Sequence, residues 1–222
     1  MGDVITETQY GTSNRADADV KGVAVIRMNN IDSQGRLDLS DLKYVNLEET
    51  ELEKYLLEPG DLLFNRTNSR ELVGKTGVWQ GQMQAVPASY LIRFRVDRQR
   101  VFPECVWALM NTSFMKHILF DKARHAIGMA NINAQELRTL PINIPSISVQ
   151  REFVNVLTAL EKISEHVKNA NDRIVCLFQT LLHRAFSGDL TAEWREAHEK
   201  ELLAEIEEQA KVLNARFQEL SQ

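Results

Sequence analysis

Residues 149–181, VQREFVNVLTALEKISEHVKNANDRIVCLFQTL, decide how this chain is organised. Apolar residues recur in this stretch at alternating steps of four and three, which is typical of one long helix with a coiled-coil seam. The seam consists of Val149, Phe153, Val156, Leu160, Ile163, Val167, Ala170, Ile174, Leu177 and Leu181. Such a helix would extend for roughly 50 Å, and its apolar stripe would face water unless a partner covered it. We therefore expect helix pairing through these residues.

The chain changes character on both sides of this stretch. After it, Ser187-Gly188-Asp189 is expected to end the helix, and Thr191 has the side chain of an N-cap for another one. The apolar spacing returns at Leu203, Ile206, Ala210, Leu213, Phe217 and Leu220. The sequence leaves open whether this second helix folds back or meets another chain. We predict three parts: a mixed domain at 1–145, a spacer helix at 146–186, and a break with a C-terminal helix at 187–222.

The region before residue 145 has shorter and mixed patterns. Residues 23–28 (VAVIRM), 61–64 (DLLF) and 90–96 (YLIRFRV) are β-prone runs bounded by Gly, Asn or Pro. In the last run Arg93 and Arg95 alternate with apolar residues, which predicts a half-buried strand. Residues 103–119 have helical spacing and begin with a proline, which the first turn of a helix accepts. These patterns predict an α+β domain followed by the long coiled-coil helix and a further C-terminal helix.

Composition sets the broad class. The chain has 222 residues, of which 44% are hydrophobic and 26% are charged, as in a globular protein. No apolar run approaches the length of a membrane span, and the N-terminus does not look like a secretory signal, so we expect no membrane contact. Cys105 and Cys176 lie among apolar residues and are interpreted as buried free thiols. That interpretation favours a reducing, cytoplasmic location.

The net charge of −5 hides an asymmetry along the chain. Residues 1–60 carry 6 Lys/Arg and 12 Asp/Glu, residues 61–145 carry 11 and 6, and residues 146–222 carry 9 and 13. The three segments therefore have charges of −6, +5 and −4. Because local patches decide whether a polyanion can bind, the central segment could contact nucleic acid despite the acidic total.

The central segment contains Gly74-Lys75-Thr76, the ending of a phosphate-binding P-loop. A P-loop also needs another glycine five positions before Gly74, and a helix that begins directly after the Gly-Lys-Thr. Ser69 occupies the first position, and Gly77-Val78-Trp79 is typical of a strand. We therefore reject a nucleotide-binding loop.

The same loop has the side chains of a DNA-reading surface. Arg can bind guanine, Asn can bind adenine, and Ser or Thr can bind bases or phosphates. The candidates here are Arg66, Thr67, Asn68, Ser69, Arg70 and Lys75. The alternative is a polar loop that is simply solvated, and this stretch taken alone favours that alternative.

No motif indicates catalysis. The five histidines lack metal-ligand spacing, and Glu48, Glu49, Glu51 and Glu53 are typical of an exposed helical face. There is no Gly-x-Ser-x-Gly elbow, no Cys-x-x-Cys and no Asp/Asn-Pro-Pro-aromatic tetrad of an amino-methyltransferase. We expect no catalytic residue, metal or cofactor.

Four segments together resemble the specificity subunits of type I restriction-modification systems. They are Tyr10-Gly11-Thr12-Ser13 with residues 25–31, residues 59–66 with 73–76, residues 127–133 with 140–145, and Gln150-Arg151-Glu152 with residues 185–190. The resemblance implies a target recognition domain that reads one half of a bipartite double-stranded DNA sequence, and a spacer helix that sets the distance between halves. It also implies partners, namely a methyltransferase subunit and a restriction subunit.

The resemblance selects further DNA-contact candidates and raises one departure. Tyr10, Thr12 and Ser13 join the loop residues, Arg93 and Arg95 are candidates for phosphate contacts, and Asn131 and Asn133 are interpreted as turn-forming. Complete subunits carry two recognition domains and two spacer helices, whereas this chain has one of each. It is therefore a half-size subunit or a fragment, and two copies could form an antiparallel homodimer. The alternative function is a non-catalytic coiled-coil adaptor that binds another protein.

Overall fold

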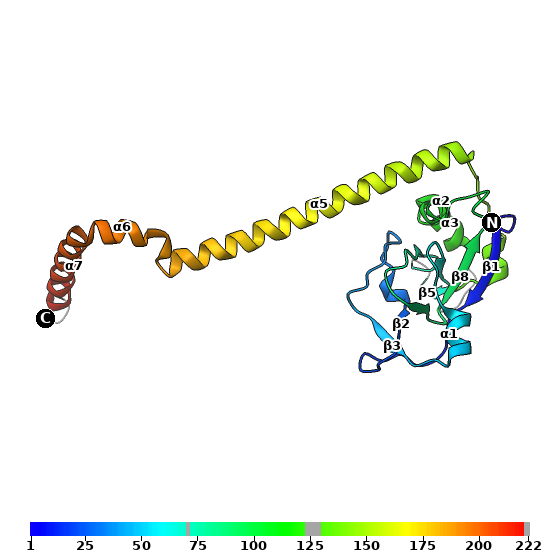
Figure 1. Cartoon of the computed structure of the whole chain (residues 1–222), viewed down its shortest axis with the longest axis horizontal. Coiled ribbons are helices and arrows are strands. Elements are labelled where there is room, and N and C mark those ends of the chain that lie inside the picture. The colour runs from blue at the N-terminus through cyan, green and yellow to red at the C-terminus, as the bar shows by residue number, and fades with distance from the viewer. Residues whose placement is uncertain (70–71, 123–129, 220–222) are drawn as a thin grey trace. The chain divides into compact units, whose positions relative to one another are not determined.

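The computed structural model describes residues 1–69, 72–122 and 130–219. It contains two compact units, Met1–Leu157 and Thr158–Gln222, and Figure 1 labels several of their elements. Both strands and helices are present, and a long helix is followed by further helices, so the predicted α+β class is confirmed. Every helix in the described ranges is too short or too polar to cross a lipid bilayer.

The first unit is built around an antiparallel sheet of four strands in the order β1-β8-β4-β6. They are β1 (Ile5–Tyr10), β8 (Leu91–Val96), β4 (Leu62–Asn65) and β6 (Thr76–Val78). Figure 1 shows β1 and β8 side by side, although 80 residues of chain separate Tyr10 from Leu91. The sheet therefore depends on contacts between segments that are distant in sequence.

The remaining strands form two smaller sheets. One has the order β3-β2-β7 and contains β3 (Lys43–Val45), β2 (Val23–Ile26) and β7 (Ala85–Pro87), with β2 and β7 parallel. The other pairs β5 (Thr67–Asn68) with β9 (Ala130–Asn131). The short helices are η1 (Met28–Asn30), α1 (Glu49–Tyr55) and α4 (Ala134–Arg138). Glu49 and Glu53 on α1 and Glu48 just before it are exposed, as predicted, whereas Glu51 is half-buried.

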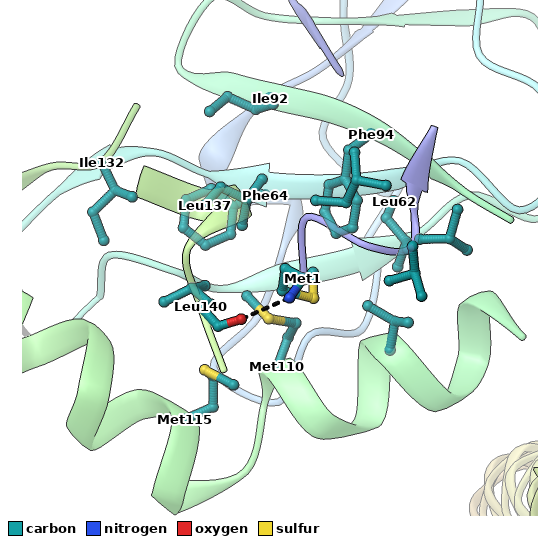
Figure 2. Packing of buried hydrophobic residues seen from close by; sticks show 14 of the residues in the cluster. Met1, Leu62, Phe64, Ile92, Phe94, Met110, Met115, Ile132, Leu137 and Leu140 are labelled. Carbon is teal, nitrogen blue, oxygen red and sulfur yellow. Dashed lines mark hydrogen bonds between the residues drawn. The ribbon is translucent and has the colours of Figure 1, made fainter. Parts of the chain in front are cut away.

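Hydrophobic cores cover both faces of the four-stranded sheet. On one face Leu62, Phe64 and Phe94 pack with residues of α2 (Pro103–Met110) and α3 (Ser113–Lys122), as Figure 2 shows. The N-terminal ammonium lies in the same core and donates a hydrogen bond of 2.7 Å to the Leu140 carbonyl. On the other face Leu63 and Leu91 pack with Trp79. Alternate residues of β4 thus enter different cores.

Two predictions about this unit are wrong in detail. The strand at 91–96 alternates as predicted but is not half-buried, because a second core covers its other face and Arg93 is only 4% exposed. The single helix expected at 103–119 is two helices, α2 and α3. The helix is interrupted at Asn111. The side-chain amide of this residue donates to the carbonyls of Thr76 and Trp107.

The long helix α5 (Ile147–Phe186) confirms that this stretch forms one helix, and the pairing through its seam stays a prediction. It ends before Gly188, whose φ of 82° lies in the left-handed region that favours glycine. After η3 (Asp189–Thr191), the expected single C-terminal helix is divided at His198 into α6 (Ala192–Ala197) and α7 (Glu199–Glu219). The interpretation of both cysteines as buried is also wrong: Cys105 is half-buried, and Cys176 is exposed on α5.

Candidate nucleic-acid interface

Three of the predicted DNA contacts meet at one edge of the first unit. Tyr10 ends β1, Arg66 follows β4, and Thr67 begins β5. The Arg66 guanidinium lies over the Tyr10 ring, 4.7 Å from its centroid. The Thr67 hydroxyl donates to the Asn131 side-chain oxygen at 3.4 Å. A stacked cation and a hydroxyl therefore lie next to each other at the ends of three strands.

Backbone hydrogen bonds hold this cluster in place. The Arg66 amide donates to the Tyr90 carbonyl at 3.0 Å, and the Ile132 amide donates to the Arg66 carbonyl at 2.9 Å. The Tyr10 hydroxyl accepts from the amide of Ala134 at 3.1 Å, at the start of α4. The Arg66 backbone is thereby hydrogen-bonded through both its amide and its carbonyl, so a ligand would meet only its side chain.

The cluster keeps accessible surface of the kind that nucleic-acid contacts use. Tyr10 is 40% exposed and Tyr90 is 50% exposed, while Arg66 is half-buried. The Nε of Arg66 is buried and has no acceptor among the described residues. Stacking on an aromatic ring favours a guanidinium in a fixed orientation, with its terminal nitrogens available as donors. We call Tyr10, Arg66, Thr67, Tyr90 and Asn131 the Arg66 cluster.

Thr12 and Ser13 have different environments. Thr12 is 3% exposed, and its amide donates to the Pro87 carbonyl at 2.8 Å, while its own carbonyl accepts from Ser89. Gly11 precedes it at a point where a Cβ atom would collide with the carbonyl oxygens of Pro87 and Ala88. The Gly-Thr pair therefore allows a close approach of two backbone segments. Ser13 is exposed and remains available to a ligand.

The Gly-Lys-Thr segment supports the loop rather than a phosphate. Gly74 has a φ of 87°, and a Cβ there would collide with Leu119. The Lys75 ammonium donates to the carbonyls of Met28, at 3.0 Å, and Ile31. Burial lowers the pKa of Lys75, and the charge of Asp32 opposes this shift. Lys75 thus has a structural partner already, and its prediction as a DNA contact stays a prediction.

The remaining loop candidates lie at the end of β5 and in the connection that follows it. Asn68 pairs with Ala130 in the two-stranded sheet. Ser69 is exposed, and its carbonyl accepts from the amides of Leu72 and Val73. Arg70 and residues 127–129 of the third resembling segment lie outside the described residues.

Arg93 and Arg95 belong to an ionic network across the sheet. Arg93 donates to the Leu56 carbonyl at 3.0 Å and pairs with Glu7. Arg95 pairs with Asp61 at 2.7 Å and also with Glu58 and Glu7. The hydrogen bond to Asp61 raises the pKa of Arg95 above its ordinary value. Their charges are compensated within the protein, so the geometry gives them a structural task first.

Sequence reasoning missed Tyr90, and it assigned Asn131 and Asn133 to turns. Asn133 is the N-cap of α4, where its side chain accepts from the amides of Gln135 and Glu136, so its structural role is confirmed. Asn131 instead contributes its side-chain oxygen to the Arg66 cluster. Tyr90 could have been noticed as an aromatic residue in a polar turn just before a strand. In the described ranges no group of His, Cys, Asp and Glu could hold a metal ion.

The first turns of α5 are fixed to the domain by Gln150, which is 1% exposed. Its Oε1 accepts from the Phe102 amide at 2.9 Å. Its Nε2 donates to the carbonyls of Arg100, at 3.0 Å, and Pro145, at 2.9 Å. This gives a physical reason for the glutamine in the Gln-Arg-Glu segment, because an amide supplies both the acceptor and the two donors that this position needs.

Comparison with known proteins gives consistent relatives. The chain is 28% identical over 200 residues to the specificity subunit of the type I restriction enzyme EcoKI of Escherichia coli K12, covering 86% of this chain and 42% of that protein. It is 25% identical over 202 residues to the StySPI specificity subunit of Salmonella potsdam, covering 88% and 43%. No protein-family model matches.

A solved structure has the same fold. The HsdS subunit from Thermoanaerobacter tengcongensis matches with a TM-score of 0.51 and 15% identity, over 76% of this chain and 38% of that chain. This chain therefore spans about two fifths of the length of the relatives that it matches.

Proposed function

We propose that this chain is a DNA-recognition subunit. It is related to the specificity subunits of type I restriction enzymes, as its sequence segments predicted. Its first unit would read one half of a bipartite double-stranded DNA target. The observation that carries this proposal is the Arg66 cluster, in which a guanidinium is held on an exposed tyrosine and the next residue along the chain presents a hydroxyl. These are groups that bind base edges, phosphates and sugars.

The candidate residues divide into three groups. Arg66, Thr67, Ser69 and Ser13 would contact DNA directly, together with Tyr10 and Tyr90. Asn68, Arg70 and Lys75 remain candidates from the sequence. Thr12, Arg93 and Arg95 would act mainly by holding the strands that present the cluster, because their polar groups are bonded within the protein.

We assign no catalytic step to this chain. A methyltransferase subunit and a restriction subunit would bind it and act on the DNA that it selects, in the interior of the cell. Helix α5 would set the distance between the two half-sites. A second copy would supply the other half as an antiparallel homodimer, whose two-fold symmetry makes the half-sites identical and inverted.

A coiled-coil adaptor is the second candidate function. The exposed apolar seam of α5 favours it, since seam residues such as Val167 and Ile174 are 63% and 65% exposed in the single chain. A protein adaptor would not need the Arg66 cluster, and replacement of that cluster would leave its partner binding unchanged.

Selection from a DNA library tests the proposal. The purified chain, alone and together with a methyltransferase subunit of a type I system, is incubated with duplexes that contain random positions, and the retained DNA is sequenced after washes of increasing salt. We expect a defined sequence to be enriched, with an affinity that falls steeply with salt because phosphate contacts release counterions. Retention of no DNA in either mixture, or retention without sequence enrichment, would contradict the proposal.

A further inference from the structure

Arg66 offers a ligand only the end of its guanidinium. The Nε atom is buried and has no acceptor among the described residues. The two terminal nitrogens are not buried, and no described residue accepts a hydrogen bond from them. They form a pair of donors that lie in one plane. A ligand with two neighbouring acceptors in that plane would therefore match Arg66.

The Tyr10 ring restricts the orientation of this donor pair. The guanidinium lies over the ring, 4.7 Å from its centroid. The ring is itself held at both ends, because the Tyr10 backbone pairs with Ile92 in the sheet and the Tyr10 hydroxyl accepts from the Ala134 amide. A donor pair that is ordered before binding loses less conformational entropy when a ligand binds. The arrangement thus favours a ligand whose acceptors have a fixed, planar geometry.

We propose that Arg66 reads a guanine in the major groove by donating to its N7 and O6 atoms; this rests on the DNA-recognition function proposed above and names the base that the Arg66 cluster selects. Guanine is the base whose major-groove edge presents two neighbouring acceptors. Adenine and cytosine present an amino donor there, which would face the donors of Arg66, and thymine presents one acceptor beside a methyl group. Each half of the target should therefore contain a guanine that depends on Arg66.

A DNA phosphate also has two acceptors, but the surroundings of Arg66 favour a base edge. Protein sites for phosphate commonly add backbone amides to a charged side chain. Here the amides of Arg66, Ile132 and Ala134 already donate to acceptors within the protein. The ammonium of Lys75, the next cation among the described residues of this loop, donates to two backbone carbonyls. A phosphate at Arg66 would gain no further donor from these groups, whereas guanine needs only the two terminal nitrogens.

DNA selection with Arg66 variants is the first test. The full chain, as wild type and as Arg66→Ala, is incubated with duplexes that contain random positions, alone and with a methyltransferase subunit of a type I system. We expect both chains to enrich the same sequence except at one position of each half-site. There the wild-type chain should require guanine, and Arg66→Ala should accept any base.

Two further variants make this comparison specific. Arg66→Met keeps an unbranched apolar side chain and should lose the guanine requirement as Arg66→Ala does, which separates the loss of the guanidinium from any loss of packing. Arg173→Ala removes an exposed arginine of α5 and should keep the guanine requirement. Circular dichroism and urea unfolding check that each variant is folded.

Replacement of that guanine by 7-deazaguanine tests the contact itself, because this base lacks the N7 acceptor and still pairs with cytosine. With one of two hydrogen bonds lost, the affinity of the wild-type chain should fall roughly 3- to 10-fold, and that of Arg66→Ala by less than about twofold. Fluorescence anisotropy measures both affinities.

The outcomes separate this proposal from the function on which it rests. Equal losses for the two chains on 7-deazaguanine would show that another residue contacts N7 and would overturn the proposal. So would an Arg66→Ala chain that loses affinity equally for every sequence and whose salt slope falls by about one, since Arg66 would then contact a phosphate. A wild-type chain that enriches a sequence in which no guanine depends on Arg66 would refute the guanine contact alone. A wild-type chain that enriches no sequence in either mixture would refute the proposed function, and the guanine contact with it.

Discussion

Replacement of Gln150 by leucine should destabilise the first unit strongly, although leucine has a similar volume. The buried amide makes three hydrogen bonds, to Phe102, Arg100 and Pro145. Each contributes about 0.5–1.5 kcal/mol, and the buried Phe102 amide left without an acceptor costs about 1–3 kcal/mol more. Added apolar burial by leucine offsets part of this loss. We expect the free energy of unfolding to fall by about 3 kcal/mol.

Urea unfolding followed by tryptophan fluorescence measures this loss. Trp79 and Trp107 lie in the first unit and Trp194 in the second, so a Trp194→Phe background reports the first unit alone. With a slope of about 2 kcal/mol per molar urea, a loss of 3 kcal/mol lowers the midpoint by about 1.5 M. Hydrogen exchange should also accelerate in the first turns of α5, because Gln150 holds them to the domain.

A matched glutamine provides the control. Gln99 is exposed, and Gln99→Leu should change the free energy of unfolding by no more than about 0.5 kcal/mol. Gln150→Glu keeps the shape and the acceptor but places a carboxylate oxygen against two carbonyls, so it should be at least as harmful as leucine. If Gln150→Leu and Gln99→Leu had the same midpoint, the three bonds would not stabilise the unit.

Four further predictions follow from single contacts. Arg66→Ala should weaken specific DNA binding by about 1–3 kcal/mol, or roughly 5- to 150-fold in fluorescence anisotropy, whereas Lys162→Ala on α5 should have little effect. Leu160→Asp with Val167→Asp should convert a dimer into a monomer in light scattering, and the exposed Lys168→Asp should not. Gly11→Ala should lower the unfolding free energy by about 1–3 kcal/mol in urea, because its methyl group would lie 2.2 Å from the Pro87 carbonyl oxygen. Gly2→Ala should cost less, because its methyl group would lie 3.3 Å from the Arg138 carbonyl oxygen. Burial and the charge of Glu104 raise the pKa of Cys105, so a smaller fraction of this thiol is thiolate at neutral pH. A thiol titration should show that the exposed Cys176 reacts first and that Cys105 gains reactivity as the pH rises.

The long helix could be predicted from sequence because its signal is local and repeated. A single seam position carries little information, but ten in one register leave few alternatives to a helix, and all ten lie on α5. The break at Gly188 was visible for the same reason, since a glycine after a periodic segment is a common helix end. The interruption at Asn111 was not visible, because its cause is a hydrogen bond to Thr76, a residue 35 positions away.

The candidate site was harder to predict because its parts come from distant segments. Tyr10 and Arg66 meet only when β1, β8 and β4 form one sheet, and Asn131 comes from the later strand β9. The sequence could nominate Arg66 as a polar loop residue. It had no means of placing an aromatic ring beneath its guanidinium.

Three arginines illustrate why residue type alone could not rank the candidates. Arg66, Arg93 and Arg95 are chemically equivalent in the sequence, and all three lie in the positively charged segment. Arg93 and Arg95 stand on a central strand beside Glu7 and Asp61, whose carboxylates compensate their charges. Arg66 stands just beyond the end of a strand, where the neighbouring group is a neutral ring.

That difference assigns opposite tasks to identical side chains. A guanidinium that already has a carboxylate partner would have to lose it before binding a phosphate, whereas a guanidinium stacked on tyrosine can bind an anion or a base edge and keep its stacking partner. An Arg→Lys exchange should separate the two tasks, because lysine lacks the planar fork. Arg95→Lys should reduce stability and leave the selected DNA sequence unchanged, and Arg66→Lys should leave stability nearly unchanged and alter the selected sequence; the reverse pattern would place the reading surface on the strand instead of at its end.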